Sequence, residues 1–392
     1  MHEVVIVSLA RTPIGSFGGK LASLTAIELG KTAMQAAMQR AGIDYNAVNE
    51  IYMGNVLQAN VGQAPARQAA LAAGFNPSVV CTTINKVCAS GMKSVMLAAQ
   101  SIRLGDAEVV LAGGMESMSQ APFLLTRQRW GNKYGNIETV DCIVRDALQD
   151  PYNGNMMGNV GELCANTYGF SRQDQDDFSI ESYKRAETAY KNGWFNNEIC
   201  PVTIPNPKGE PTVITEDEEY RNVRYDKVAS LKPAFDKNGT ITAFNASKIN
   251  DGAAALVLMS RAKADELGLK PIARIVSYAD AEQDPDWFTT APSKAAPLAL
   301  KRANLTIDQI DACEINEAFA VVALSNMRLL GVPHEKTNRF GGAVALGHPV
   351  GASGARIICT LISSLQQCNG RYGLAAICNG GGGASAVVVE LL

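Results

Sequence analysis

The stretch AAMQRAGI at residues 36–43 recurs as LALKRANL at residues 298–305, which lie 262 positions further along the chain. Three more pairs follow in the same order and at nearly the same offset: Val48 with Ile310, SGMKSV at 90–95 with SGARII at 353–358, and LAGG at 111–114 with CNGG at 378–381. One such match is weak, because alanine-rich helices resemble each other by chance. Four matches in register predict two duplicated halves.

Short apolar runs alternate with amphipathic stretches in the first of these halves. The runs at residues 4–7, 50–53 and 108–111 are typical of buried strands, whereas residues 27–40 and 91–104 have helical periodicity. This alternation predicts an α/β fold with a mostly parallel sheet.

The segment between the halves differs in composition and contains Trp130 and Trp194, two of the three tryptophans. Ser171 and Asp174 have the spacing of a capping pair and predict a helix that runs to about residue 192. We therefore expect three parts: an N-terminal half over residues 1–118, continued by 250–270, an inserted loop subdomain over 119–249, and a C-terminal half over 271–392.

The composition excludes several classes of function. The 392 residues include 35 Lys and Arg against 38 Asp and Glu, a balance without the basic surface that nucleic acid or an anionic membrane would attract. No apolar run approaches the roughly 18 residues of a membrane span, and the N-terminus lacks the basic start of a secretory signal. The nine cysteines form no C-x-x-C pair, so we expect reduced thiols in the cytoplasm and no metal site.

Cys88 lies where a strand-like run gives way to a helix, in NKVCASGMK at residues 85–93. The N–H groups and dipole of a helix start would lower the pKa of this thiol and could hold an oxyanion. The turn GHPVGASG at 347–354 takes the same place in the second half and carries His348, with a helix expected from about Ser353. Duplication thus allows a thiol and an imidazole to face each other. A core cysteine and an ordinary loop histidine are the alternatives.

Two further polar stretches follow strand-like runs. Cys378 precedes four glycines, which could bring an N–H close to an oxyanion or merely form a tight turn. Asn316 and Glu317 follow the run at residues 312–315, where a positioned side chain competes with a simple helix N-cap.

Together these stretches resemble the thiolase superfamily, most closely its short-chain acetyl-CoA acetyltransferases. Supporting blocks are ARTPIGSF at 10–17, GGMESMS at 113–119, and NAS at 245–247 through NDG at 250–252. The resemblance covers essentially the whole chain. It implies two similar α/β halves with central mixed sheets in αβαβα layers, an inserted loop domain, and assembly as a homodimer or homotetramer.

The resemblance also implies a reaction of lipid metabolism, the reversible Claisen condensation of two acetyl-CoA to acetoacetyl-CoA and CoA by a ping-pong route. Cys88 would be the nucleophile that carries the acetyl group, and His348 its base and later an oxyanion donor. Cys378 would be the acid/base at the α-carbon of the second acetyl-CoA. Asn316 would hold a water that, with His348, stabilises the enolate oxygen. The backbone N–H groups of Cys88 and Gly380 would form the other oxyanion site.

Substrate contacts implied by the same resemblance are Leu148, Met157, Arg221, Ser247, Phe288, Ala318 and Phe319. Coenzyme A enters as substrate and product, so no resident cofactor is implied. Potassium stimulates some relatives, and the resemblance links Tyr183 to that ion.

Two departures from the family pattern stand out. Short-chain members usually have His-Met-Gly where this chain has Met156-Met157-Gly158, and the missing histidine contacts the thioester-bearing part of the substrate. A degradative 3-ketoacyl-CoA thiolase of broader chain length therefore stays an alternative, although Met157 with Phe288 and Phe319 could close the acyl pocket. The second departure is Phe340, where many relatives have asparagine.

Two remoter functions are compatible with the implied fold. A decarboxylating ketoacyl synthase has this fold but needs a cysteine with two histidines, and this chain has Asn316 at one of those positions. A non-catalytic thiolase-like lipid-binding protein would have lost the nucleophile or the base, yet Cys88, His348 and Cys378 are all present.

Overall fold

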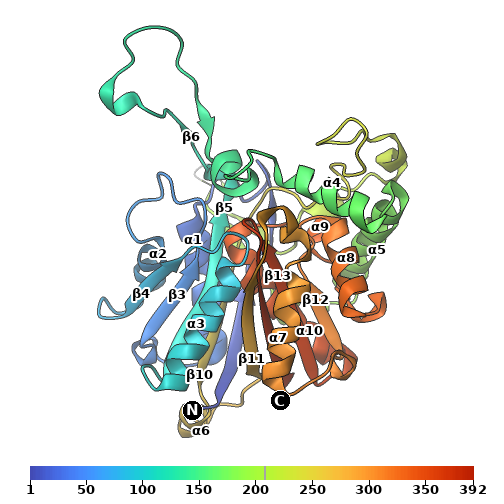
Figure 1. Cartoon of the computed structure of the whole chain (residues 1–392). Helices are drawn as coiled ribbons and strands as arrows, with labels where there is room; N and C mark the ends of the chain where they lie inside the picture. Colours follow the sequence, from blue (N-terminus) through green and yellow to red (C-terminus); the bar gives the residue numbers. More distant parts are fainter. Residues whose placement is uncertain (207–208) are drawn as a thin grey trace.

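The computed structural model describes residues 1–206 and 209–392 and confirms an α/β fold of two similar halves (Figure 1). The first half contains β1 (Val4–Arg11), β2 (Gly15–Ser16), α1 (Ala26–Ala41), β3 (Glu50–Gly54), α2 (Pro65–Ala73), β4 (Val80–Ile84), α3 (Ser90–Leu104), β5 (Val109–Ser117), β10 (Asn250–Ser260) and α6 (Arg261–Glu266). The second contains β11 (Ala273–Glu282), α7 (Pro292–Ala303), β12 (Ala312–Ile315), α8 (Ala320–Leu330), α9 (Ala343–Leu346), α10 (Val350–Cys368), β13 (Tyr372–Asn379) and β14 (Gly383–Leu391).

These strands form one mixed sheet of ten strands, in the order β12-β13-β14-β11-β1-β10-β5-β3-β4, with β2 paired to β10. β3 is parallel to β4 and β5, and β12 is parallel to β13, whereas the other pairs are antiparallel. Every residue of β1, β5 and β10 is buried. Helices that cover both faces explain these continuous apolar runs.

The duplication extends to backbone detail. α1 ends at Gly42 with a φ of 67°, and α7 ends at Asn304, its counterpart in the repeat register, with a φ of 56°. In the first half, β4 pairs in parallel with the outer edge of β3. At the equivalent edge of β12 in the second half, a single parallel β-bridge between Cys313 and Thr337 takes the place of that strand. The two halves join where β1 and β11 pair over two residues each.

The helices and the two halves of this sheet form the expected αβαβα layers, and the two central sheets that the resemblance implies are joined into one. α3 and α10 share one buried core with apolar residues from strands of both halves, including Met92, Ile358, Leu256 and Val387. Separate cores hold α1 and α2 against the outer face of the first half and α7 against that of the second.

Small residues let α3 and α10 meet backbone to backbone. A Cβ atom on Gly354 would lie 2.4 Å from the backbone nitrogen of Met92, and one on Gly91 would lie 2.8 Å from that of Ala355. The prediction that the second helix starts near Ser353 is wrong, since α10 begins at Val350. Pro349 is the N-cap of α10, and its carbonyl accepts the N–H groups of Ala352 and Ser353, as an N-cap carbonyl does at the start of a helix.

The segment between the halves contains β6 (Phe123–Leu124), β7 (Val140–Asp141), α4 (Met157–Tyr168), α5 (Arg172–Lys191), β8 (Val202–Ile204) and β9 (Thr212–Ile214). Ser171 and Asp174 form the predicted capping box of α5. α5 packs against α8 and α9 of the second half, so this segment contacts the turn that leads to His348.

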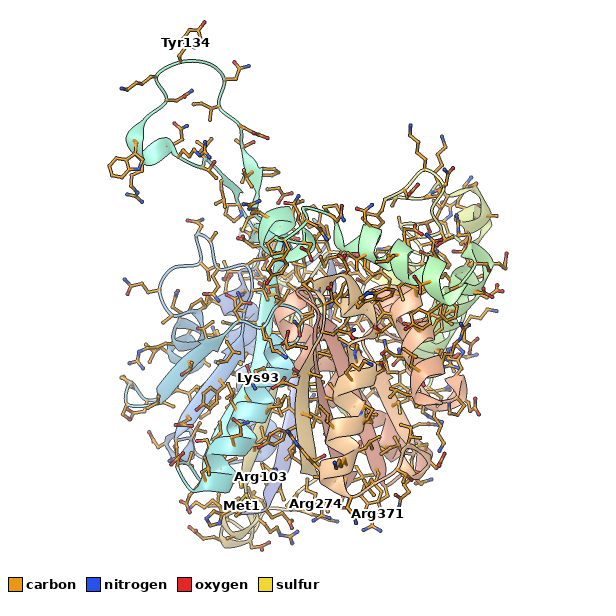
Figure 2. The ribbon with its side chains drawn as sticks, in the orientation of Figure 1. Met1, Lys93, Arg103, Tyr134, Arg274 and Arg371 are labelled. Atoms are coloured by element: carbon orange, nitrogen blue, oxygen red, sulfur yellow. The ribbon has the colours of Figure 1, made fainter. Side chains whose placement is uncertain are left out.

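A long arm between β6 and β7 stands away from the body of the molecule (Figure 1). It exposes large rings, with Tyr134 at its tip (Figure 2) and Trp130 nearby, 97% and 86% exposed. Within the described part of the chain, none of the helices has the length and apolar character needed to cross a membrane.

Candidate active site

Cys88 is presented by a strained turn that connects β4 to α3. Val87 has a φ of 46°, a left-handed conformation that β-branched residues rarely adopt. The turn is fixed by Asn85 Oδ1, which accepts the N–H of Val87 at 3.0 Å, and by the hydroxyl of Ser90, which accepts the N–H of Lys86 at 2.8 Å. Such over-determined strain is typical of functional turns.

The electrostatic surroundings of Cys88 favour the neutral thiol. Burial raises the pKa of Cys88 to about 11, although the backbone N–H groups of Gly380 and of Cys88 itself face the sulfur and oppose this shift. The prediction of a lowered pKa is therefore wrong, because desolvation of the thiolate outweighs the N–H groups. A thiol with a raised pKa can act as a nucleophile only where a base removes its proton.

His348 has one ring nitrogen free to accept a proton. Its ring Nδ1 lies 2.6 Å from the hydroxyl of Ser353, whose proton is donated to the carbonyl of Pro349 at 2.9 Å. Nδ1 must then be the ring nitrogen that carries the hydrogen. Nε2 keeps its lone pair and is buried without a partner among residues 1–206 and 209–392. Burial first, then the charge of Arg356, lowers the pKa of His348 to about 3, so the resting ring is neutral.

Cys378 lies at the end of β13, fully buried beside Met157 and Phe288. Burial, followed by the nearby Cys88, raises the pKa of Cys378 well above its usual value. The chain then turns into β14 through Gly381 and Gly382, both with φ near 85°, a geometry that favours glycine. This turn directs the N–H of Gly380 at the sulfur of Cys88.

Asn316 directly follows β12 and is buried. Neither Oδ1 nor Nδ2 of this side chain has a hydrogen-bond partner within the described residues. A buried amide with both ends free indicates a site for a water or ligand atom. The alternative of a helix N-cap is wrong, since Phe319 takes that position in α8.

A cavity of about 670 Å³ has His348 in its wall, whereas Cys88, Cys378 and Asn316 do not line it. The two thiols lie behind the wall: Cys378 packs in one cluster with Met157, and Cys88 packs against the cluster of Val350. Five of the residues assigned to the site from sequence line the cavity: Leu148, Met157, Ser247, Phe319 and His348. Phe288 and Ala318 lie behind it in the buried cluster of Cys378. The N–H of Ser247 donates to the carbonyl of Ala318 at 3.0 Å, which joins two of the expected substrate segments.

Arg221 and Tyr183, which the resemblance links to CoA and to potassium, do not line this cavity. The side chain of Arg221 is 61% exposed and forms an ion pair with Glu216, so its contact with CoA stays a prediction. Met156 does line the cavity. Tyr183 is buried, with its ring 5.7 Å from Nζ of Lys248.

The arrangement suits acyl transfer, since His348 in the cavity wall keeps one ring nitrogen free as a base, and two neighbouring thiols with N–H donors lie behind that wall. A family model for the thiolase N-terminal domain matches residues 4–262, and a model for the thiolase C-terminal domain matches residues 269–391. The chain belongs to the thiolase family.

Relatives of this thiolase match over its full length. It is 55% identical to an acetyl-CoA acetyltransferase of Schizosaccharomyces pombe, over 99% of this chain and 98% of the relative. A cytosolic acetyl-CoA acetyltransferase of Gibberella zeae is 51% identical over 100% and 99% of the two chains. The crystal structure of a thiolase from Ascaris suum in complex with coenzyme A superposes with a TM-score of 0.94 and 45% identity, over 100% of both chains.

Several residues of the thiolase site were not identified from sequence. Ser353 orients His348, and Asn250 Oδ1 accepts the backbone N–H of His348 at 2.8 Å. Glu116 accepts N–H groups from the loop after β3 and from Gly351. Asn250 and Glu116 lie in the sequence blocks that carry the family resemblance, and this was the available signal. Ser353 also lies in such a stretch, GHPVGASG at 347–354, but only its place at an expected helix start was read from it.

Proposed function

We propose that this thiolase is an acetyl-CoA C-acetyltransferase that interconverts two acetyl-CoA with acetoacetyl-CoA and CoA. The observation that carries the proposal is the side chain of His348 in the cavity wall, where Ser353 fixes the hydrogen on Nδ1 and the buried Nε2 has no hydrogen-bond partner in the described residues. The raised pKa of Cys88 and the lowered pKa of His348 agree with a neutral thiol and a neutral base. The names of the relatives from Schizosaccharomyces pombe and Gibberella zeae support it.

In the first half-reaction, the Cys88 thiol gives its proton to Nε2 of His348 while the sulfur attacks the thioester carbonyl. The N–H groups of Cys88 and Gly380 stabilise the oxyanion of this step. The C–S bond to CoA then breaks, and the leaving thiolate takes a proton from Cys378. Acetyl-Cys88, a protonated His348 and a Cys378 thiolate result.

In the second half-reaction, the Cys378 thiolate removes a proton from the α-carbon of a second acetyl-CoA. Protonated His348 and a water on the free amide of Asn316 stabilise the enolate oxygen. The enolate carbon attacks acetyl-Cys88, a C–C bond forms, and the expelled Cys88 sulfur recovers its proton from His348. All groups return to their resting state, and the reverse direction is thiolysis.

Incubation with acetyl-CoA followed by mass measurement of the intact protein tests this proposal. We expect the mass of one acetyl group to be gained by the wild type and lost in Cys88→Ser. Cys378→Ala should still accept acetyl, because the CoA thiolate can leave without a proton, but it should make little acetoacetyl-CoA. Absence of acetyl transfer in the wild type would exclude the activity.

A second candidate, a 3-ketoacyl-CoA thiolase of broader chain length, is favoured by Met156 in the cavity wall, beside Met157 and Phe319. An apolar wall can accept a longer acyl chain. Steady-state thiolysis of acetoacetyl-CoA and 3-ketooctanoyl-CoA distinguishes the two functions. A higher kcat/KM for the longer substrate would assign the broader activity.

We also propose a cytoplasmic protein that works in lipid metabolism as a homodimer or homotetramer. The cytosolic relative supports the location, and the exposed rings of Trp130 and Tyr134 on the arm support contact with further copies. Light scattering coupled to size exclusion measures the molar mass of the assembly, and removal of the arm should reduce that mass.

Stimulation by potassium is a separate prediction, tested by steady-state rates in potassium and sodium buffers of equal ionic strength.

A further inference from the structure

Lys248 is a cation beside the cavity that the proposed chemistry does not use. The residue lines the 670 Å³ cavity directly after Ser247. Its Nζ lies 2.8 Å from the carbonyl oxygen of Ala246, 3.4 Å from that of Val344 and 3.5 Å from that of Phe244. An ammonium has three donors and no acceptor, so each hydrogen faces one backbone carbonyl.

This ammonium has no ion-pair partner in the part of the chain that the structure describes, residues 1–206 and 209–392. Burial lowers the pKa of Lys248 to about 8, while Glu219 and Glu317 act at longer range to raise it. The ring of Tyr183 adds a face 5.7 Å from Nζ, within the distance at which an aromatic ring attracts a cation. The cage of three carbonyls and a ring therefore suits a monovalent cation.

The cage joins two segments that flank the cavity. Phe244 and Ala246 belong to the loop that presents Ser247, whereas Val344 belongs to α9, which ends two residues before His348. The ammonium is thus a bridge between the substrate loop and the backbone that leads to the catalytic imidazole.

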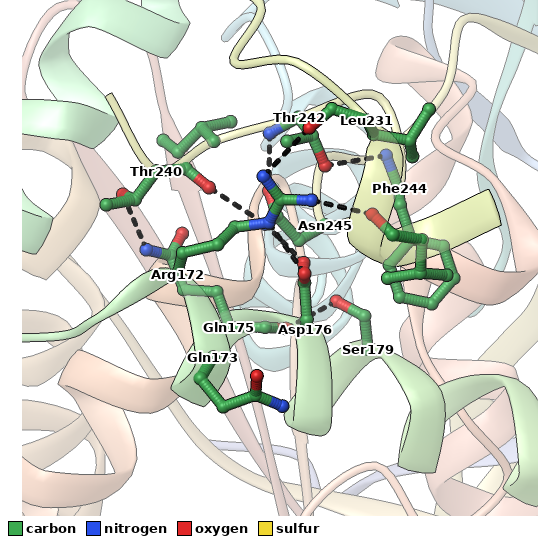
Figure 3. Close-up of polar contacts among 12 residues, drawn as sticks. Arg172, Gln173, Gln175, Asp176, Ser179, Leu231, Thr240, Thr242, Phe244 and Asn245 are labelled. Carbon is green, nitrogen blue, oxygen red and sulfur yellow. Dashed lines mark hydrogen bonds and ion pairs between the residues drawn. The ribbon is translucent and has the colours of Figure 1, made fainter. Parts of the chain in front are cut away.

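The start of the same loop is fixed independently (Figure 3). Asn245 donates to Asp176 of α5 at 2.9 Å and accepts the N–H of Thr242 at 2.8 Å. Arg172 in turn holds Asp176 at 2.6 Å and the carbonyl of Leu231 at 3.0 Å. These contacts anchor the loop before Ser247, and the bridge from Lys248 anchors it after that residue.

We propose that Lys248 is a positioning residue whose ammonium serves as a tethered monovalent cation, holding Ser247 and the backbone before His348 at a fixed separation across the substrate cavity. The kinetic effect expected of this role rests on the proposed function, because Lys248 acts through Ser247 and His348. The cage itself does not depend on that function. It follows that the wild type needs no free cation, which opposes the prediction of potassium stimulation, and that removal of the amine leaves carbonyls able to bind one.

Steady-state kinetics of acetoacetyl-CoA thiolysis test the proposal. The rates are measured first in tetramethylammonium chloride and then in ammonium or potassium chloride of the same ionic strength. Tetramethylammonium is too large for the cage and cannot donate. We expect the wild type to be insensitive to the exchange. Lys248→Ala in tetramethylammonium should show a KM raised about tenfold, the effect of losing hydrogen bonds from a charged group. Ammonium or potassium should restore most of this loss.

Two variants separate the charge from the rest of the side chain. Lys248→Met fills the space without donors, so it should lose affinity and resist rescue. Lys301→Ala, on the exposed face of α7, is the matched control and should behave as wild type. The proposal is overturned if Lys248→Met retains the wild-type KM, or if neither cation rescues Lys248→Ala.

A measurement of thermal stability, which does not depend on catalysis, tests the cage separately from the proposed function. Because a ligand that binds the folded state raises its stability, ammonium should raise the Tm of Lys248→Ala relative to tetramethylammonium and leave that of Lys301→Ala unchanged. A Tm response without acetyl transfer in the wild type would refute the function and retain the cage. Equal Tm values for Lys248→Ala in both salts would refute the cage.

Discussion

His348 and Ser353 determine which ring nitrogen of the imidazole can act as a base. Their side chains meet at 2.6 Å between Nδ1 and the hydroxyl oxygen, and that hydroxyl donates its proton to the carbonyl of Pro349 at 2.9 Å. Nδ1–H is therefore the donor in the first contact, and the lone pair is left on Nε2. When Nε2 is protonated, the positive ring is held by a charge-assisted hydrogen bond to Ser353.

Ser353→Ala should lower kcat for thiolysis by about 10- to 100-fold, because a hydrogen bond to a charged group contributes roughly 1.5–3 kcal/mol. Rapid-quench measurement of Cys88 acetylation checks which step slows. Ser364→Ala, in the same helix, removes a buried hydroxyl that has no partner in the described residues and should leave kcat unchanged. Equal effects of the two substitutions would contradict the role of Ser353.

Asn316→Ala should separate the two half-reactions. In the proposed mechanism the free amide holds the water that stabilises the enolate oxygen, and loss of one oxyanion donor costs about 100- to 1000-fold in rate. We expect condensation to fall by that factor while acetyl transfer from acetyl-CoA to Cys88 continues within a few fold. Intact-mass kinetics with acetyl-CoA and a coupled assay for acetoacetyl-CoA measure both steps. An equal loss in both would show that Asn316 is only structural.

The reactivity of Cys88 toward iodoacetamide should rise steeply with pH in the free protein. Because burial raises the pKa of Cys88 to about 11, the thiolate fraction grows about tenfold per pH unit below that value and shrinks as the pH falls. The alkylation rate, located by peptide mass, should therefore increase about 100-fold from pH 7 to pH 9. Cys88→Ser identifies the background. A plateau near pH 7 would show that the N–H groups dominate instead of burial.

The fold could be predicted from the sequence because both halves repeat the same short patterns of apolar and helix-ending residues. The apolar runs of β3 and β12 and the caps at Gly42 and Asn304 depend on neighbouring residues only. Cys88 and His348 could be paired for the same reason, since both lie in corresponding turns of the two halves.

Features that depend on distant residues could not be predicted. The pKa of Cys88 depends on burial of the thiol, which packs against a cluster of apolar residues from both halves. Phe340, which departs from the family pattern, is fully buried and packs on Trp194 and Phe195, with ring centroids 5.2 Å and 5.5 Å away. A pocket for this ring exists only after the inserted segment has folded onto the second half.

Gly354→Ala should destabilise the protein strongly. The added Cβ would lie 2.4 Å from the backbone nitrogen of Met92, so α3 and α10 would have to separate, at a cost of about 3 kcal/mol in the free energy of unfolding. Gly161→Ala, in α4, is the control, since its Cβ would meet the end of the flexible Ile241 side chain. Urea unfolding should show a loss for Gly354→Ala and little change for Gly161→Ala. A similar stability of both variants would contradict the close approach of the two helices.

Glu116→Gln should weaken the contact between the loop after β3 and the start of α10. One carboxylate oxygen accepts the N–H groups of Val56 and Gly351, both at 2.9 Å, and the other accepts those of Leu57 and of the Asn55 side chain. An amide can replace one oxygen, so its NH₂ faces two donors in either orientation. We expect a loss of about 2–4 kcal/mol in the free energy of unfolding, because buried donors left without acceptors cost about 1–3 kcal/mol each. Glu108→Gln, at an exposed position, should change it by less than about 0.5 kcal/mol; equal unfolding curves for the two variants would show that Glu116 does not hold α10.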